Sequence, residues 1–167
     1  MEFIRIDEEI TLSKTNHSDC DAMVEHLQDK EIYNQTLQIP YPYTFKDSDY
    51  IVKYFQSTTL KYGKLTNWAI RNKDQRLIGI IGFHNGIKSH KEEIGYWLAK
   101  TYWGKGIMTK TLRKVCEVAF EEFGLMRITA NIFENNFASA KVLEKCNFVL
   151  EAPCLRNHYL KNNKLQN

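Results

Sequence analysis

The feature that most constrains this chain of 167 residues is a strand, a glycine loop and a helix that follow one another between Glu93 and Phe123. Residues 93–99 are aromatic and aliphatic, which is typical of a buried strand. Gly104 and Gly106 then allow a tight turn that presents bare backbone N–H groups. The residues that follow at the spacing of one helical face are Leu112, Val115, Cys116, Ala119 and Phe123. The sequence therefore predicts a strand that enters a helix through a glycine loop.

A glycine loop at a helix N-terminus can bind an anion, because its aligned N–H groups and the helix dipole point at the same place. A phosphate-bearing ligand at residues 103–109 is one interpretation, and an ordinary strand-to-helix connection is the other. The loop is not a P-loop, since no Gly-Lys-Ser/Thr ends it, and it lacks the full glycine set of the dinucleotide fingerprint. Spacing alone leaves both interpretations open.

The composition favours a single domain over residues 1–167. Hydrophobic residues make up 43% of the chain and charged residues 26%, which argues against a disordered or membrane-embedded protein. No apolar run approaches the ~20 residues of a membrane span, and the acidic, alternating N-terminus does not look like a signal peptide. We therefore expect a cytoplasmic protein with no membrane partner.

The charge and the spacing of cysteines and histidines argue against two classes of function, nucleic-acid binding and metal binding. A net charge of +3 with scattered lysines gives little support for nucleic-acid binding. The four cysteines form no CxxC pair, and the five histidines form no HxxxH or HExxH pattern. We therefore expect no metal site, and reduced thiols fit a cytoplasmic location.

The rest of the chain predicts elements in the order β-α-α-β-β-β-α-β-α-β. The first strand is expected over residues 2–12, and Thr15–Asn16 precede the first helix. The two prolines in Ile39–Tyr43 exclude a helix there, whereas Thr44–Asp47 has the character of a capping box that opens the second helix. The further expectations are strands over 67–71, 77–83, 93–99, 127–133 and 148–150, a turn at Asn85–Gly86, and a short helix capped by Asn136. This order predicts an α/β (α+β) domain with one central mixed, mostly antiparallel sheet flanked by helices.

Three segments make the chain similar to a known family: EIGYWL, YWGKGIMTK and NFASAKVLEKCNF. In this order and spacing they resemble the GCN5-related N-acetyltransferase (GNAT) superfamily, in particular its branch of ribosomal-protein N-terminal acetyltransferases (RimJ/RimL type). The resemblance extends from the early helices to about Tyr159. It implies a GNAT fold, whose splayed strands form an acetyl-CoA groove, and an N-acetyltransferase that moves an acetyl group directly to a primary amine in a ternary complex.

The resemblance also implies which residues bind coenzyme A. Main-chain groups at the end of the strand would hold the pantetheine arm, and these belong to Trp97, Leu98 and Ala99. The N–H groups of the loop would hold the phosphates, and they belong to Trp103, Gly104, Lys105, Gly106, Ile107, Met108 and Thr109. Asn136 and Ser139 match the family's N-x-x-S motif, which packs beside the thiol end of the cofactor.

The chain departs from the family pattern at a few places. Trp103 and Met108 replace the usual first and last residues of the Gln/Arg-x-x-Gly-x-Gly/Ala loop, a change that main-chain donors tolerate. Asn147 replaces the glycine before the C-terminal phenylalanine, and asparagine also adopts left-handed turns. Relatives add a final strand after the segment equivalent to residues 158–165, so we expect the last strand to be missing or supplied differently.

Acetylation of an amine needs a base, because an alkylammonium is charged at neutral pH. We expect Glu93 to be this base, since it opens the strand beside the cofactor groove; a solvated acidic pair with Glu92 is the alternative. Neighbours on a strand point to opposite faces, so only one of the two can face the site. We expect Ser139 to protonate the departing thiolate, with Tyr96 and Tyr159 as alternatives; a cap or cofactor contact remains open for Ser139.

The acceptor is less constrained than the donor. A main-chain N–H near Leu98 would stabilise the oxyanion. A protein N-terminal α-amine would need an open groove, for example between the Tyr41–Tyr43 loop and the C-terminal segment. A polyamine or amine antibiotic would need several carboxylates, for which the candidates are Glu92, Glu93 and Glu134. A non-catalytic acyl-CoA-binding module is a further alternative, and the chain is expected to be a monomer or a homodimer.

Overall fold

The computed structural model describes residues 3–84, 86–156 and 158–167. Within these residues the centre is a six-stranded sheet in the order β1-β2-β3-β4-β5-β6, antiparallel except for the parallel pair β5–β6. Its strands are β1 (Phe3–Arg5), β2 (Thr11–Ser13), β3 (Asn67–Arg71), β4 (Leu77–Phe83), β5 (Lys91–Leu98) and β6 (Arg127–Thr129). A separate antiparallel pair joins β7 (Tyr159–Lys161) to β8 (Lys164–Gln166). The predicted mixed, mostly antiparallel sheet is confirmed.

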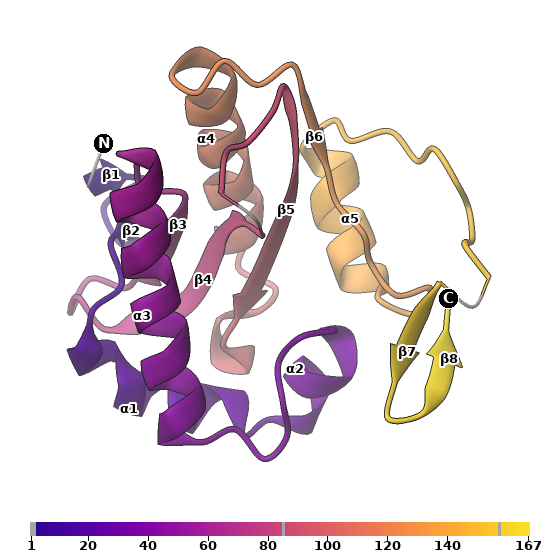
Figure 1. Cartoon of the computed structure of the whole chain (residues 1–167), viewed down its shortest axis with the longest axis horizontal. Helices are drawn as coiled ribbons and strands as arrows, with labels where there is room; N and C mark the ends of the chain where they lie inside the picture. The colour runs from indigo at the N-terminus through magenta and orange to yellow at the C-terminus, as the bar shows by residue number, and fades with distance from the viewer. Residues whose placement is uncertain (1–2, 85, 157) are drawn as a thin grey trace.

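Helices cover both faces of the large sheet (Figure 1). They are α1 (Cys20–Leu27), α2 (Lys30–Gln35), α3 (Phe45–Tyr62), α4 (Ile107–Glu121) and α5 (Phe137–Lys145). On one face Met23 of α1 and Val52 of α3 pack against Ile80. On the other face Leu112 of α4 packs in a larger core that contains Trp68. The sheet therefore separates two hydrophobic cores.

Capping residues set where the early helices begin. The Thr44 hydroxyl accepts from the N–H of Asp47, and the Asp47 carboxylate accepts from the N–H of Thr44 at 2.8 Å. This is the predicted capping box, and α3 ends at Gly63 in the left-handed conformation, as expected for a helix C-terminus. Asn16 and Asp19 form the same reciprocal pair at a short 3₁₀ turn that leads into α1.

Three predicted strands differ from the structure. The segment expected as one strand over residues 2–12 is the hairpin β1–β2, because Asp7 accepts the N–H groups of Glu9 and Ile10 at 2.9 Å each and reverses the chain. The strand expected over 127–133 ends at Thr129, where its pairing with β5 stops. Residues 148–150 form no strand, since none of the described strands pairs with them; Phe148 packs half-buried against the core, whereas Val149 and Leu150 are exposed. The short helix α2 was not predicted, and Asn85 of the predicted Asn85–Gly86 turn lies outside the described residues.

The expectation for the final strand was that it is missing or supplied differently. β8 is present, and it pairs with β7 rather than with the large sheet. Asn162 and Asn163 join the two strands with φ values of 51° and 57°. Positive φ at both central residues is the type I′ pattern that suits a tight hairpin, and asparagine tolerates it.

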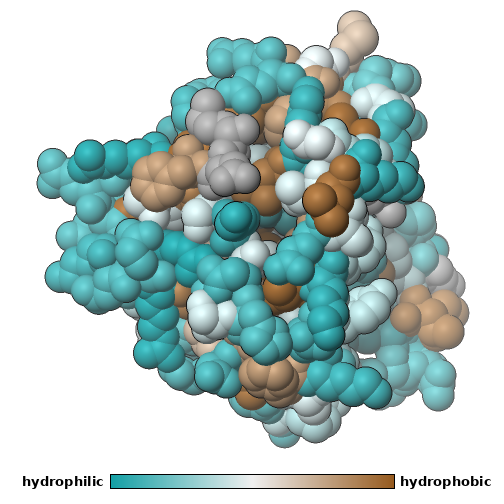
Figure 2. All heavy atoms as spheres, turned by 60° about the vertical axis from the view of Figure 1, so that its left-hand side comes forward, coloured by the Kyte–Doolittle hydropathy of each residue, from teal (hydrophilic) through white to brown (hydrophobic). Residues whose placement is uncertain are grey.

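The surface around α3 is mostly hydrophilic, with isolated hydrophobic side chains (Figure 2). Leu60 of α3 is one of the exposed hydrophobic residues. Among the helices that the structure describes, none combines the length and the hydropathy needed to cross a lipid bilayer.

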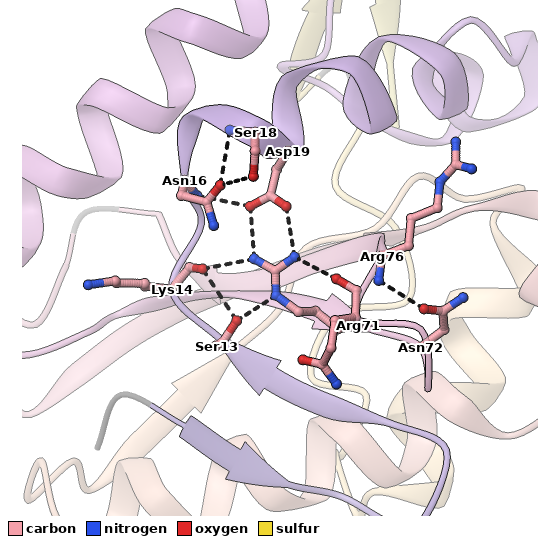
Figure 3. Close-up of polar contacts among 9 residues, drawn as sticks. Ser13, Lys14, Asn16, Ser18, Asp19, Arg71, Asn72 and Arg76 are labelled. Carbon is pink, nitrogen blue, oxygen red and sulfur yellow. Dashed lines mark hydrogen bonds and ion pairs between the residues drawn. The ribbon is translucent and has the colours of Figure 1, made fainter.

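A buried ion pair between Arg71 and Asp19 ties the N-terminal segment to the sheet (Figure 3). The guanidinium nitrogens lie 2.7 and 2.9 Å from the two carboxylate oxygens, and the side chains are only 8% and 5% exposed. Nε donates to the Ser13 hydroxyl at 2.6 Å, and the remaining N–H groups donate to the carbonyls of Lys14 and Gln75 at 3.1 Å each. Every N–H of the guanidinium thus has an acceptor, which is what a buried charge requires.

We expect Arg71→Ala to lower the free energy of unfolding by about 3–5 kcal/mol, because it leaves the Asp19 carboxylate buried without its partner. Urea unfolding followed by circular dichroism measures this change. The matched control is Arg76→Ala, which removes an exposed pair with Glu25 and should cost about 1 kcal/mol or less. Equal losses of unfolding free energy in the two variants would contradict the stabilising role of the buried Arg71–Asp19 pair.

Candidate active site

The candidate site lies where β5 and β6 separate (Figure 1). The two strands pair only through residues 91–93 of β5 and 127–129 of β6, and β5 continues alone to Leu98. From Ile94 onward, none of the described strands pairs with this edge of β5. The N–H and C=O groups of an unpaired edge can bind an extended ligand through main-chain hydrogen bonds. The splayed strands expected for the fold are therefore present.

The pairing with β4 decides which main-chain groups of β5 point into this opening. The carbonyl of Glu93 accepts from the N–H of His84 at 3.1 Å, and the N–H of Ala99 donates to a β4 carbonyl at 2.8 Å. Hydrogen-bonded positions recur at every second residue of an antiparallel strand, so the odd-numbered residues of β5 face β4. The residues whose main-chain groups face the opening are Ile94, Tyr96 and Leu98.

Two of the three residues predicted to contact pantetheine, Trp97 and Ala99, have main-chain groups that face β4 and not the opening. Ala99 uses its N–H for β4, and its carbonyl accepts from the N–H of Tyr102 at 2.9 Å. Trp97 has the same main-chain orientation, and its side chain packs against the core of α1 and α3. Leu98 is the predicted residue that faces the opening, and Tyr96 joins it. The sequence signal for Tyr96 was the two-residue period of the strand.

The glycine loop leads into a helix N-terminus that no side chain caps. Gly104 and Gly106 both have φ of +73°, and a Cβ at either position would meet no atom within 4 Å. Glycine is therefore favoured at these two positions by the positive φ and not by a lack of space for a side chain. α4 starts at Ile107 with Gly106 as its cap and without a side-chain hydrogen bond to its first turn. The N–H groups of this turn are thus positioned to bind an anion.

Trp103 attaches the loop to the end of β5. Its indole N–H donates to the Leu98 carbonyl at 2.7 Å, and its main-chain N–H donates to the Lys100 carbonyl at 3.1 Å. The main-chain N–H of Trp103 is therefore engaged, and the predicted phosphate contacts are better placed on residues 104–109. The indole bond also gives a physical reason for tryptophan at this position.

Ser139 and Tyr96 meet beside the opening. Asn136 caps α5 as predicted, and its side chain accepts from the N–H of Ser139 at 3.1 Å. The Ser139 hydroxyl is buried and lies 2.7 Å from the Tyr96 hydroxyl. Burial raises the pKa of Tyr96 to about 12, against the opposing effect of its hydrogen bond with Ser139. Tyr96 is therefore protonated at neutral pH, and the two hydroxyls can pass a proton between them.

The two acidic residues at the start of β5 have different surroundings. Glu92 accepts the N–H groups of residues 88–89 at 2.6 and 3.0 Å, so it closes the preceding loop. Glu93 lies on the other face, where its carboxylate is 3.7 Å from Nε2 of His84 and about one-third exposed. Gly95 makes room for that imidazole, because a Cβ there would lie 2.6 Å from Nε2. Of the two, only Glu93 is free to meet a ligand.

Two aromatic residues complete the surroundings. Tyr159 of β7 packs edge-on against Phe133, with ring centroids 6.2 Å apart. Burial raises the pKa of Tyr159 and the charge of Glu93 raises it further, so these two groups lie within electrostatic range. In the predicted aromatic loop, Tyr43 is buried in the core, whereas Tyr41 is exposed and packs beside α2.

Comparison with known proteins decides the family. Residues 9–149 match the family described as an acetyltransferase (GNAT) domain. The chain belongs to the GNAT acetyltransferases. Its fold superposes on RimL, a ribosomal-protein alpha-N-acetyltransferase in complex with coenzyme A, with a TM-score of 0.86, 21% identity and coverage of 99% of this chain and 93% of that one. It also superposes on spermidine N-acetyltransferase from Vibrio cholerae, in complex with coenzyme A and spermine, with a TM-score of 0.77, 17% identity and coverage of 96% and 92%.

A curated relative is the uncharacterized N-acetyltransferase YoaA of Bacillus subtilis. It is 37% identical over 97 residues, which are 57% of this chain and 54% of YoaA. The chain thus spans about half the length of the first curated relatives that it matches.

The raised pKa of Tyr96 predicts a specific dependence of stability on pH. An unfolded tyrosine ionises near pH 10 and the folded one near 12, so its contribution to stability is complete below pH 10 and is lost as the pH rises toward 12. We expect the free energy of unfolding to fall more steeply between pH 9.5 and 11 in the wild type than in Tyr96→Phe, by up to about 1.4 kcal/mol per pH unit.

Urea unfolding at each pH measures this difference. Tyr50→Phe is the control, since Tyr50 is 68% exposed, and this variant should keep the wild-type slope. A wild-type slope in Tyr96→Phe would show that Tyr96 is not the group responsible.

Proposed function

We propose that the protein transfers an acetyl group from acetyl-CoA to a primary amine, and that this amine is the N-terminal α-amino group of a protein or peptide. The observation that carries the proposal is the unpaired edge of β5 beside the uncapped N-terminus of α4, in a chain of the GNAT family. An extended amide-containing arm suits the strand edge, and phosphates suit the helix N-terminus.

The residues around the opening fit coenzyme A. The N–H groups of residues 104–109 would hold the phosphates. The N–H and C=O of Tyr96 and the N–H of Leu98 would hold the pantetheine arm, because the Leu98 carbonyl already accepts from the Trp103 indole. Asn136 and Ser139 would then lie beside the thiol end, as in the family motif. When bound, acetyl-CoA supplies the thioester that the amine attacks.

Glu93 is the group best placed to accept a proton from the acceptor. Its carboxylate is partly exposed, it lies at the point where the strands separate, and its neighbour His84 carries no competing negative charge. Removal of a proton directly or through one water leaves a neutral amine that can react. Holding both substrates in one complex supplies much of the remaining rate enhancement.

The proton for the departing thiolate would come from Ser139. Its hydroxyl is buried and hydrogen-bonded to the neutral Tyr96 hydroxyl, which can replace the donated proton. Tyr159 is the second candidate, since it stays protonated and lies near Glu93. The main-chain N–H of Leu98 faces the opening and could stabilise the oxyanion.

A polyamine acceptor is supported less well by the described carboxylates. Several acidic groups would have to converge on a polycation, yet Glu92 and Glu93 point to opposite faces of β5. Glu134 accepts a hydrogen bond from the side chain of Asn167 at 3.0 Å. Of these three described carboxylates, Glu93 is the one that lies where β5 and β6 separate.

The activity is tested by the release of free thiol from acetyl-CoA with three kinds of acceptor: short peptides, polyamines and aminoglycosides. We expect thiol release with peptides that have a free N-terminus and none with the same peptides after N-terminal acetylation. Coenzyme A binding without turnover on any amine would favour a non-catalytic acyl-CoA-binding module.

The loop assignment predicts that Gly106→Val weakens coenzyme A binding at least about tenfold, because hydrogen bonds to charged groups contribute about 1.5–3 kcal/mol each. Valine at φ of +73° strains the loop and places a side chain where the phosphates would bind. Isothermal titration calorimetry measures the affinity. Gly63→Val is a matched control, because Gly63 also has open space and a φ of +65°, and it should bind coenzyme A as the wild type does.

The base assignment predicts that Glu93→Gln lowers kcat by about 10²–10⁴-fold at pH 7, with coenzyme A affinity unchanged. The deficit should shrink above pH 8, since an α-amine has a pKa of about 7.7–8.0 and becomes neutral without help. Thiol release between pH 6.5 and 9.5 measures the profile. Glu92→Gln, which keeps an oxygen for the loop N–H groups, should retain wild-type kcat, and an unaltered profile in Glu93→Gln would remove Glu93 from the mechanism.

A further inference from the structure

A pocket near the proposed acceptor site is lined entirely by amides and lysines. It opens between α2, the residues before α5 and the β7–β8 hairpin, and its lining consists of Asn34, Asn135, Lys161, Asn162, Lys164 and Gln166. No carboxylate belongs to this set of described residues. The inference below rests on the proposed acetyl transfer and concerns what is attached to the acceptor amine.

The pocket adjoins the proposed catalytic groups on two sides. Asn135 directly precedes Asn136, whose side chain caps α5 at Ser139. Lys161 is two residues after Tyr159 on β7, so the two side chains share one face of the strand. Asn136 also donates to the carbonyl of Gln35, the last residue of α2, at 3.5 Å. The residue that caps Ser139 thus contacts the helix that forms one wall of the pocket, and an acceptor bound beside Ser139 would extend its next groups toward this pocket.

Lys161 fixes one wall of the pocket. Its Nζ donates to the carbonyl of Thr36 at 2.5 Å and to that of Tyr33, and it lies 4.0 Å from the centroid of the Tyr33 ring. The Tyr33 hydroxyl in turn donates to the Asn162 side chain at 2.7 Å. These contacts hold the hairpin against the C-terminal end of α2, where the helix dipole favours a positive charge.

The two lysines of the pocket, Lys161 and Lys164, form no ion pair with a carboxylate among the described residues. Some lysines elsewhere, Lys100, Lys110 and Lys114 among them, form ion pairs with carboxylates. Within the described part of the chain, Lys161 contacts carbonyls and aromatic rings only, and exposed Lys164 has no ion pair. Ammonium and amide N–H donors together match the acceptor oxygens of a carboxylate.

We propose that this amide-and-lysine pocket binds a carboxylate carried by the acceptor, so that the enzyme prefers amines with a carboxylate nearby. The carboxylate belongs either to an acidic side chain just after the acetylated N-terminus or to the free C-terminus of a very short peptide. Both sources present the same group, and a polycationic amine is disfavoured by like charge.

The test compares kcat/KM for matched peptides whose second residue is Asp, Asn or Lys, all with amidated C-termini. We expect the Asp peptide to exceed the Asn peptide about fivefold, near the upper range for a partly exposed ion pair, and the Lys peptide to be poorest. A dipeptide with a free or an amidated C-terminus forms the second arm and distinguishes the two carboxylate sources.

Lys164→Glu should abolish or invert the preference for Asp, because it reverses the charge at an exposed position that needs no repacking. Lys73→Glu, an equal charge change in the turn between β3 and β4, should keep the wild-type preference. Binding of the N-acetylated Asp peptide, measured by calorimetry, gives a readout that needs no chemistry and should weaken only in Lys164→Glu.

The failures of the two proposals are distinguishable. Acetylation of all peptides with equal kcat/KM, or an unchanged Asp preference in Lys164→Glu, overturns the carboxylate pocket and leaves the acetyltransferase standing. Binding of coenzyme A without acetylation of any amine overturns the proposed function and this inference with it. Faster acetylation of spermidine than of the Asp peptide also overturns the inference.

Discussion

The arrangement of the site depends on one constraint: β5 and β6 pair for only three residues and then separate. Main-chain polar groups without a partner are costly inside a protein, so an edge of this kind must meet water or a ligand. The same separation ends β6 at Thr129 and leaves the main chain of Tyr96 and Leu98 facing the opening. The glycine loop, held to β5 by the Trp103 indole, then places the α4 N-terminus beside this edge.

The two sides of the opening use different physical means. In the proposed function the donor side relies on backbone groups, which tolerate changes of side chain, and this would account for Trp103 and Met108 at unusual positions in the loop. In the proposed function the acceptor side relies on side chains from α2, α5 and the C-terminal hairpin. Lys161 joins two of these elements by bonding the carbonyls at the end of α2, and the Tyr33–Asn162 hydrogen bond joins the same two.

Much of the fold could be predicted because it follows from local chemistry. The Thr44–Asp47 capping box, the Asn136 cap and the glycine loop are short-range signals, and each has its predicted structure. The errors arose where a distant partner decides the outcome or where a short local turn was not recognised. Residues 148–150 look like a strand but have no strand to pair with, and the Asn162–Asn163 turn converts the C-terminal segment into a hairpin.

The sequence by itself determined the resemblance to the family, and it predicted the cofactor loop and the candidate residues Glu93 and Ser139, because these rest on motifs of neighbouring residues. Only the tertiary structure decided which groups face the site. The register with β4 turns Ala99 away from the opening, and Tyr96, 43 positions before Ser139, is brought to hydrogen-bonding distance of it. The amide-and-lysine pocket likewise exists only because folding joins α2 to the C-terminal hairpin, a long-range contact that no local pattern encodes.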